Sequence, residues 1–206
     1  MTSIAIIGAG GHGKVVADIA SQSGYKQIDF YDDDDTKIGT MVGSWSVKGH
    51  LEDLLQQQDK YTSVFVAIGN NELRSNLNKM VDPLKQITLI HPQAVVSPYA
   101  IVGRGTVVMP GVIINAFAEI QNGVIINSAA VIEHDCFIEN YVHISPGAVL
   151  SGNVKVGEYS WLGSNCSIRQ EISVGANAVV GMGAVVVENV KQATTVVGSP
   201  AKELSK

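Results

Sequence analysis

Aliphatic residues recur at every sixth position through the second half of the chain. Every member of the series is Val, Ile or Leu: Val96, Val102, Val108, Ile114, Ile120, Ile126, Ile132, Ile138, Ile144, Leu150, Val156, Leu162, Ile168, Val174, Val180 and Val186. A helical period of 3.6 residues or the alternation of an ordinary strand does not produce this spacing. The pattern therefore indicates an internal repeat of six residues.

A second register lies four residues after each aliphatic residue and holds mainly small or apolar side chains, from Ala100 and Thr106 to Ala184 and Val190. Gly, Asn, Ser, Glu and Pro, which favour turns, separate the two registers. The combination predicts a parallel β-helix of triangular section, with large aliphatic side chains inside and small ones at the corners. Three hexads then form one coil of about 18 residues, and coils stack about 4.8 Å apart.

The first ninety residues follow a different pattern, in which buried strands alternate with helices. Strands are predicted near residues 3–7, 28–31, 64–68 and 88–90, and helices near 15–20, 51–55 and 73–80. This alternation predicts an α/β, Rossmann-like domain. We place that domain at residues 1–90 and the β-helix with its tail at 91–206, because His91-Pro92 disfavours helix at the junction.

A glycine-rich loop follows the first strand and opens the first helix. Gly8, Gly10 and Gly13 match G-x-G-x-x-G, and Asp32 follows at the end of the next strand. Such a loop lets the backbone approach a diphosphate at a helix N-terminus. Since the domain has about half the strands of a dinucleotide-binding fold, we predict one nucleotide diphosphate rather than NAD. A tight turn without a ligand is the alternative.

Further candidates for substrate binding lie in the same loops or at the ends of other strands. The complete set is Gly10, Gly11, His12, Gly13, Asp32, Asp33, Gly69, Asn70 and Asn71. His12 could contact phosphate or cap the helix, and the aspartates could form a solvated loop. The asparagines could bind the ligand or only shape a turn.

Composition excludes several classes of protein. A net charge of −5 argues against non-specific nucleic-acid binding. The chain shows no signal-like start and no apolar run of about 18 residues, so we expect a cytoplasmic protein without a membrane partner. Cys136 and Cys166 fall in the small-residue register and are expected to be buried packing residues, and no metal site is expected.

Several segments together resemble bacterial nucleotide-sugar acetyltransferases of the hexapeptide-repeat superfamily. They are Gly8–Gly13, Ala67–Asn71, Val131–Cys136, Val142–Ala148, Leu150–Asn153 and Gly198–Lys202. The resemblance is strongest to enzymes that N-acetylate UDP-4-amino-4,6-dideoxy-N-acetylglucosamine in the bacillosamine pathway, a family that also includes sialic-acid O-acetyltransferase-like members. It implies a left-handed helix, acetyl-CoA as co-substrate, and a homotrimer with acetyl-CoA in grooves between subunits.

The chemistry of amine acylation singles out Glu133-His134-Asp135. Acyl transfer needs a base and a donor for the thioester oxygen, and imidazole titrates near neutral pH. We predict His134 as the base, with Asp135 rather than Glu133 as the carboxylate that orients it. Gly152 lies 18 residues later and should stack over His134, leaving room for the thioester and exposing its N–H.

The resemblance implies cofactor contacts at other positions of the β-helix. These are His143, Gly152, Gly181, Gly183 and Lys202, the last with a CoA phosphate or simply in solvent. An O- or N-acetyltransferase acting on another nucleotide sugar, such as a GDP-perosamine-like one, is a competing function. A non-catalytic β-helix that binds a nucleotide sugar is the other. The nucleotide, the amino sugar, the acyl chain and the downstream glycan stay open.

Overall fold

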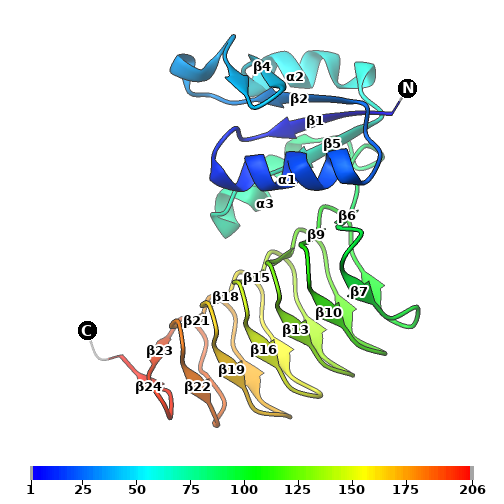
Figure 1. Cartoon of the computed structure of the whole chain (residues 1–206). Coiled ribbons are helices and arrows are strands. Elements are labelled where there is room, and N and C mark those ends of the chain that lie inside the picture. The colour runs from blue at the N-terminus through cyan, green and yellow to red at the C-terminus, as the bar shows by residue number, and fades with distance from the viewer. Residues whose placement is uncertain (1, 205–206) are drawn as a thin grey trace. The chain divides into compact units, whose positions relative to one another are not determined.

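The structure is a computed structural model that describes residues 2–204. Residues up to Pro92 form one compact unit, and residues from Gln93 onward form the other. The first unit is α/β and the second consists of short parallel strands that wind into coils (Figure 1).

The first unit contains a five-stranded sheet whose strand order is β3-β4-β2-β1-β5. Its elements are β1 (Ser3–Ile7), α1 (Gly11–Gln22), β2 (Gln27–Tyr31), η1 (Asp35–Lys37), β3 (Met41–Val42), β4 (Trp45–Gly49), α2 (Leu51–Gln57), η2 (Gln58–Lys60), β5 (Ser63–Val66), α3 (Asn71–Met80) and β6 (Leu89–Ile90). Strand β3 pairs antiparallel with β4, and the other pairings in this sheet are parallel. The predicted α/β architecture is confirmed, but the β3–β4 hairpin was not predicted.

Burial in this sheet follows from its coverage by helices. Every residue of β1 is buried, as expected for a parallel strand with helices on both faces. Ala5 and Ile7 pack in one core cluster with Leu51 and Leu54 of α2. The N-terminus of α1 reaches the other face, where Gly13 lies against the ring of Phe30.

The second unit has the predicted period in every coil. Residues 18 apart pair in register, as in Ile114 with Ile132 and Leu150 with Ile168. Each two-residue strand from β7 to β22 ends on one of the aliphatic residues that define the period. The small-residue register is buried as predicted, with Cys136 and Cys166 at 1% and 0% exposure. A parallel β-structure with this repeat is typical of a left-handed β-helix.

The strands form three faces. One face holds β7 (Val95–Val96), β10 (Ile113–Ile114), β13 (Val131–Ile132), β16 (Val149–Leu150), β19 (Ser167–Ile168) and β22 (Val185–Val186). The second holds β8 (Ile101–Val102), β11 (Glu119–Ile120), β14 (Phe137–Ile138), β17 (Lys155–Val156) and β20 (Ser173–Val174). The third holds β9 (Val107–Val108), β12 (Ile125–Ile126), β15 (His143–Ile144), β18 (Trp161–Leu162), β21 (Val179–Val180), β23 (Thr195–Val197) and β24 (Lys202–Glu203).

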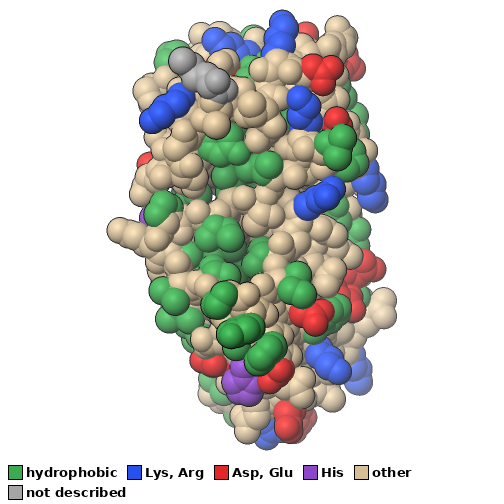
Figure 2. All heavy atoms as spheres, turned by 90° about the vertical axis from the view of Figure 1, so that its right-hand side faces the viewer, with side chains coloured by type: hydrophobic (Ala, Val, Ile, Leu, Met, Phe, Trp, Pro, Cys, Tyr) green, Lys and Arg blue, Asp and Glu red, His purple; other side chains and the backbone are tan. Residues whose placement is uncertain are grey.

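Several outward-facing positions on the coils are hydrophobic. On the first face they include Val95, Ile113, Val149 and Val185, which are 66%, 37%, 36% and 37% exposed. Figure 2 shows hydrophobic side chains dispersed among polar ones on one side of the molecule. Large exposed apolar groups of this kind commonly mark contacts with ligands or other chains.

Candidate functional site

The glycine loop of the first unit contains two kinds of glycine. A side chain at Gly8 (φ +103°) would lie 2.9 Å from the carbonyl oxygen of Ala67, and one at Gly13 would overlap the carbonyl oxygen of Gly8. These two glycines are therefore needed for the chain to pack on itself. Gly10 and Gly11, in contrast, have open space where a side chain would lie. Their backbone is the part of the loop that another molecule can approach.

The N-terminus of α1 presents donors without a side-chain cap. Gly10 is the N-cap residue and no side chain there accepts a hydrogen bond from the helix. The first N–H groups of a helix carry partial positive charge and favour anions. The adjoining His12 has a buried Nε2 that forms no hydrogen bond within residues 2–204. Burial and, next, the positive charge of Arg74 lower the pKa of His12 to about 4, so its ring is neutral at pH 7.

The two predicted aspartates brace the loops around this helix N-terminus. Asp32 accepts hydrogen bonds from the N–H of Ala9 at 2.7 Å, from the N–H of Asp34 at 3.0 Å, and from Lys37 at 3.1 Å. Burial acts to raise the pKa of Asp32, but these hydrogen bonds outweigh it and the pKa is lowered. Asp33 accepts a hydrogen bond from the N–H of Leu51 at 3.0 Å. Both carboxylates thus have partners within the chain.

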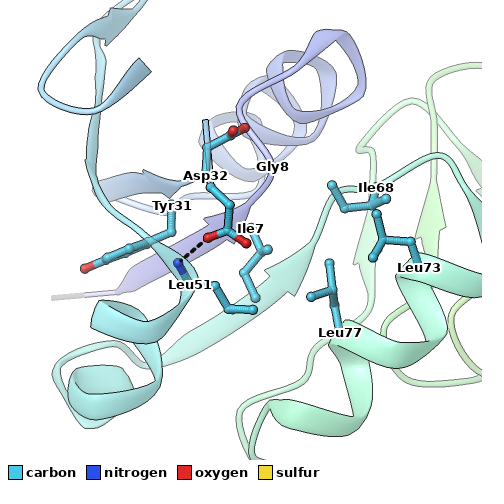
Figure 3. Close-up of a pocket in the computed structure, with 9 residues that line it drawn as sticks. Ile7, Gly8, Tyr31, Asp32, Leu51, Ile68, Leu73 and Leu77 are labelled. Atoms are coloured by element: carbon cyan, nitrogen blue, oxygen red, sulfur yellow. Dashed lines mark hydrogen bonds between the residues drawn. The ribbon is translucent and has the colours of Figure 1, made fainter. Parts of the chain in front are cut away.

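A pocket of about 180 Å³ lies at the carboxyl ends of β1 and β2, between α2 and α3 (Figure 3). Its lining is mainly apolar and consists of Ile7, Gly8, Tyr31, Asp32, Asp33, Leu51, Ile68, Leu73 and Leu77. Open α/β sheets bind ligands outside the carboxyl ends of their strands. The site predicted from the glycine motif therefore has an enclosed cavity next to it.

A second, more open pocket of about 490 Å³ lies beside Ala9, with Lys14, Lys37 and Trp45 among its lining residues. Sequence reasoning missed both lysines. Lys14 directly follows the last motif glycine, and this position could have been a signal for it.

The predicted residues after β5 have internal partners. The side chain of Asn70 accepts a hydrogen bond from the N–H of Leu73 at 2.9 Å and so caps α3. Asn71 Oδ1 accepts a hydrogen bond from Arg74 at 2.8 Å. Arg74 is fully buried and also donates to the carbonyl oxygens of Ile68 and Gly69. Sequence reasoning missed this arginine, which holds the loop at the end of β5 in place.

In the second unit, the predicted base and one acid are in contact. His134 Nδ1 lies 2.7 Å from Asp135 Oδ2, and both side chains are more than half exposed, at 62% and 56%. Asp135 has a positive φ of 61°, at a turn position that Asp tolerates better than most residues. Glu133 instead accepts a hydrogen bond from Asn115 Nδ2 at 2.8 Å, one coil earlier. Of the two acids, Asp135 is the one in contact with the imidazole.

Gly152 stacks on His134, as the 18-residue coil predicts. A side chain built at Gly152 would lie 2.6 Å from Cε1 and 2.7 Å from Nε2 of His134. The space that we expected for a thioester is therefore occupied by the histidine ring, and the expectation was wrong on this point. Within residues 2–204 the N–H of Gly152 forms no hydrogen bond, so it remains an available donor.

The remaining predicted residues are dispersed along the later coils. His143 stacks on Trp161, with ring centroids 5.0 Å apart, and Trp161 donates a hydrogen bond to Ser145. A side chain at Gly181 would lie 2.7 Å from Val197, whereas Gly183 has open space. Lys202 is exposed and lies 4.0 Å from Glu188.

Two negative observations apply to residues 2–204. They contain no group of three or more His, Cys, Asp or Glu side chains placed to hold a metal ion. None of their helices is long and apolar enough to cross a membrane.

Comparison with known proteins places both units. Residues 3–81 match the family described as the PglD N-terminal domain. UDP-N-acetylbacillosamine N-acetyltransferase of Bacillus subtilis (strain 168) is 38% identical over 111 residues, which are 52% of this chain and 51% of the relative. The matched segment thus spans about half the length of that curated relative.

Two solved structures match almost end to end. The acetyltransferase domain of PglB from Neisseria gonorrhoeae FA1090, in complex with acetyl coenzyme A, is 42% identical with a TM-score of 0.93, and 98% of each chain is covered. PerB from Caulobacter crescentus, in complex with CoA and GDP-perosamine, is 35% identical with a TM-score of 0.93, covering 100% of this chain and 98% of PerB. The chain belongs to the PglD-like family of acetyl-CoA-dependent nucleotide-sugar N-acetyltransferases.

Proposed function

We propose that the protein transfers the acetyl group of acetyl-CoA to the 4-amino group of a UDP-4-amino-4,6-dideoxy-N-acetyl-hexosamine, giving UDP-N,N′-diacetylbacillosamine. The observation that carries the proposal is the 2.7 Å contact between His134 Nδ1 and Asp135 Oδ2, which leaves Nε2 as the reactive nitrogen. It occurs in a chain that is 42% identical to a domain solved with acetyl coenzyme A. The named relative from Bacillus subtilis supports the choice of acceptor.

His134 acts as the general base in this proposal. Asp135 accepts the Nδ1 proton and so holds the ring in the tautomer whose Nε2 is free. Nε2 takes the proton that the amine loses as its nitrogen forms a bond to the acetyl carbon. It returns that proton to the sulfur as the carbon–sulfur bond breaks, which releases CoA as a thiol.

Gly152 supplies the donor for the acetyl oxygen. Its N–H has no partner within the described chain and adjoins the His134 ring. A backbone donor fixed by the stacked coils stabilises the negative charge that develops on the oxygen. We assign His143, Gly181, Gly183 and Lys202 to the binding of CoA, and Glu133 to a supporting role through Asn115.

The first unit binds the nucleotide part of the acceptor. The free donors of α1, together with Gly10, Gly11, His12 and Gly13, suit a diphosphate, and Lys14 and Lys37 add positive charge nearby. The pocket of Figure 3 suits the base, with Asp33 as its polar group. Asp32, Gly69, Asn70 and Asn71 shape these loops through their internal hydrogen bonds.

We also propose that the active enzyme is a homotrimer with its acetyl-CoA grooves between subunits. The His134 and Asp135 side chains are more than half exposed in the single chain, so the chain alone does not enclose the base. The outward aliphatic residues of the first β-helix face supply apolar surface for such contacts. Sedimentation at micromolar concentration tests this; a monomer that is fully active would contradict it.

A GDP-linked amino sugar is the second candidate acceptor, because PerB was solved with GDP-perosamine and is 35% identical over the whole chain. The experiment is release of CoA thiol from acetyl-CoA with a panel of UDP- and GDP-amino sugars and their hydroxyl counterparts. We expect rapid turnover of the UDP-4-amino-4,6-dideoxy sugar.

The same assay tests the base. His134→Ala should lower kcat at least ~10²-fold while the protein stays folded. Near-wild-type turnover in that variant would refute the role of His134. Turnover only on hydroxyl acceptors, or on none, would refute N-acetylation.

A further inference from the structure

Two aromatic side chains lie next to the His134–Asp135 pair, and the mechanism above does not use them. Tyr99 and Phe117 stack with ring centroids 5.6 Å apart and an interplanar angle of 33°. They are 67% and 61% exposed. Figure 2 shows a histidine at the edge of a group of exposed hydrophobic side chains, with acidic side chains beside it.

The coil register fixes the distance between these rings and the base. Tyr99, Phe117 and Asp135 are separated by 18 residues each, so they occupy the same corner of three successive coils. The N–H of Asp135 donates to the carbonyl oxygen of Ala116 at 3.3 Å, which brings Phe117 within one coil of the carboxylate that holds His134. The aromatic pair therefore continues the active-site corner toward the earlier coils.

The two sides of His134 along the helix axis are different. On the side of the later coils, Gly152 lies against the imidazole ring. On the side of the earlier coils, the corner presents Phe117 and then Tyr99. A molecule that reaches Nε2 from the earlier coils must therefore pass over aromatic rings.

We propose that Tyr99 and Phe117 form a platform for the apolar face of the acceptor sugar and select sugars with a deoxygenated edge. Aromatic faces carry partial negative charge and attract the C–H groups of a pyranose ring. A methyl group at carbon 6 gains from burial against the rings, whereas a hydroxyl there loses hydrogen bonds to water without replacement. The inference rests on the proposed function and adds to it a reason for preferring a 6-deoxy acceptor.

The test is steady-state kinetics on the full chain with saturating acetyl-CoA and two acceptors, a UDP-4-amino-4,6-dideoxy sugar and its 6-hydroxy counterpart. Phe117→Ala should raise the KM for the deoxy sugar about tenfold, the effect of losing a modest hydrophobic contact. The preference for the deoxy over the hydroxy sugar should fall by a similar factor, and the KM for acetyl-CoA should not change. Phe117→Tyr should restore the KM, and Tyr99→Ala should act in the same direction as Phe117→Ala.

Tyr159→Ala is the matched control. Tyr159 also has a positive φ and stacks on an aromatic neighbour, Tyr141, with centroids 5.6 Å apart, but at a different corner of the coil. Its substitution should leave the KM for both sugars unchanged. An equal rise in KM in this variant would show a general effect of weakening the coils and would overturn the proposal.

Three further outcomes separate the possibilities. If the wild-type protein acetylates no amino sugar, the proposed function itself fails. If it does so and the aromatic variants keep both the KM and the preference, the platform is refuted while the function stands. If Phe117→Ala lowers the sedimenting mass and regains activity at high protein concentration, the rings join copies of the chain and the platform is again refuted.

Discussion

Substituting Gly152 by alanine tests whether the coil register positions the catalytic base. The added Cβ would lie 2.6 Å from Cε1, 2.7 Å from Nε2 and 3.3 Å from Nδ1 of His134. Non-bonded carbon atoms are in favourable contact at about 3.5–4.0 Å, so the ring must move by roughly 1 Å. The ring is 62% exposed and can move outward, so the fold should tolerate the change.

A displacement of about 1 Å at a catalytic group can lower the rate ~10²-fold. We therefore expect Gly152→Ala to reduce kcat by about that factor, measured by thiol release at saturating acetyl-CoA and acceptor. The Tm by circular dichroism should stay close to that of the wild-type protein, because the clash involves a side chain that can leave.

A double-mutant cycle identifies the cause. If Gly152→Ala acts through His134, it should cost little more once His134→Ala is already present, because residues in contact are not additive. Wild-type kcat in Gly152→Ala would refute the stacking argument. A further loss of ~10²-fold in the His134→Ala background would instead locate the damage at the Gly152 N–H.

Three further predictions follow from other parts of the structure. His12 has a pKa of about 4 in the fold and 6.5 as a model value, so the unfolded chain binds more protons between these pH values; unfolding free energy should rise from pH 4 to 6.5, and this slope should shrink in His12→Gln, as urea titrations can show. Burial raises the pKa of both Cys136 and Cys166 to about 11, so neither should react with a thiol reagent at pH 8 until the protein is unfolded, and rapid labelling of the native protein would contradict this. Asn70→Ala removes the cap of α3 and should lower the unfolding free energy by about 1 kcal/mol, whereas an unchanged denaturation midpoint would show that Asn70 does not stabilise the helix.

The β-helix could be predicted from the sequence in detail because its contacts repeat at a fixed separation. Once the period of six is known, residues 18 apart must be neighbours, and the contact between His134 and Gly152 follows without further information. What the period cannot give is the rotamer of a side chain. This is why the ring of His134, rather than a substrate, was not foreseen over Gly152.

The first unit was predictable in its order of strands and helices but less so in its loops. The β3–β4 hairpin was missed because Met41–Val42 is too short to carry an alternating pattern. Asp32, Asn70 and Asn71 were expected to contact the substrate, since polar residues at strand ends often do. In the structure their side chains bond to Ala9, Leu73 and Arg74, which depends on how loops from distant segments meet.

The register of the β-helix also limits how this sequence can change in length. A coil of 18 residues added after Glu171 would only lengthen the helix, because each residue before it keeps its neighbour. The same coil inserted between Asp135 and Ser151 would place a new residue over His134 and move Gly152 one layer away. The interval between the histidine and its glycine is therefore as much a part of the catalytic apparatus as the two residues themselves.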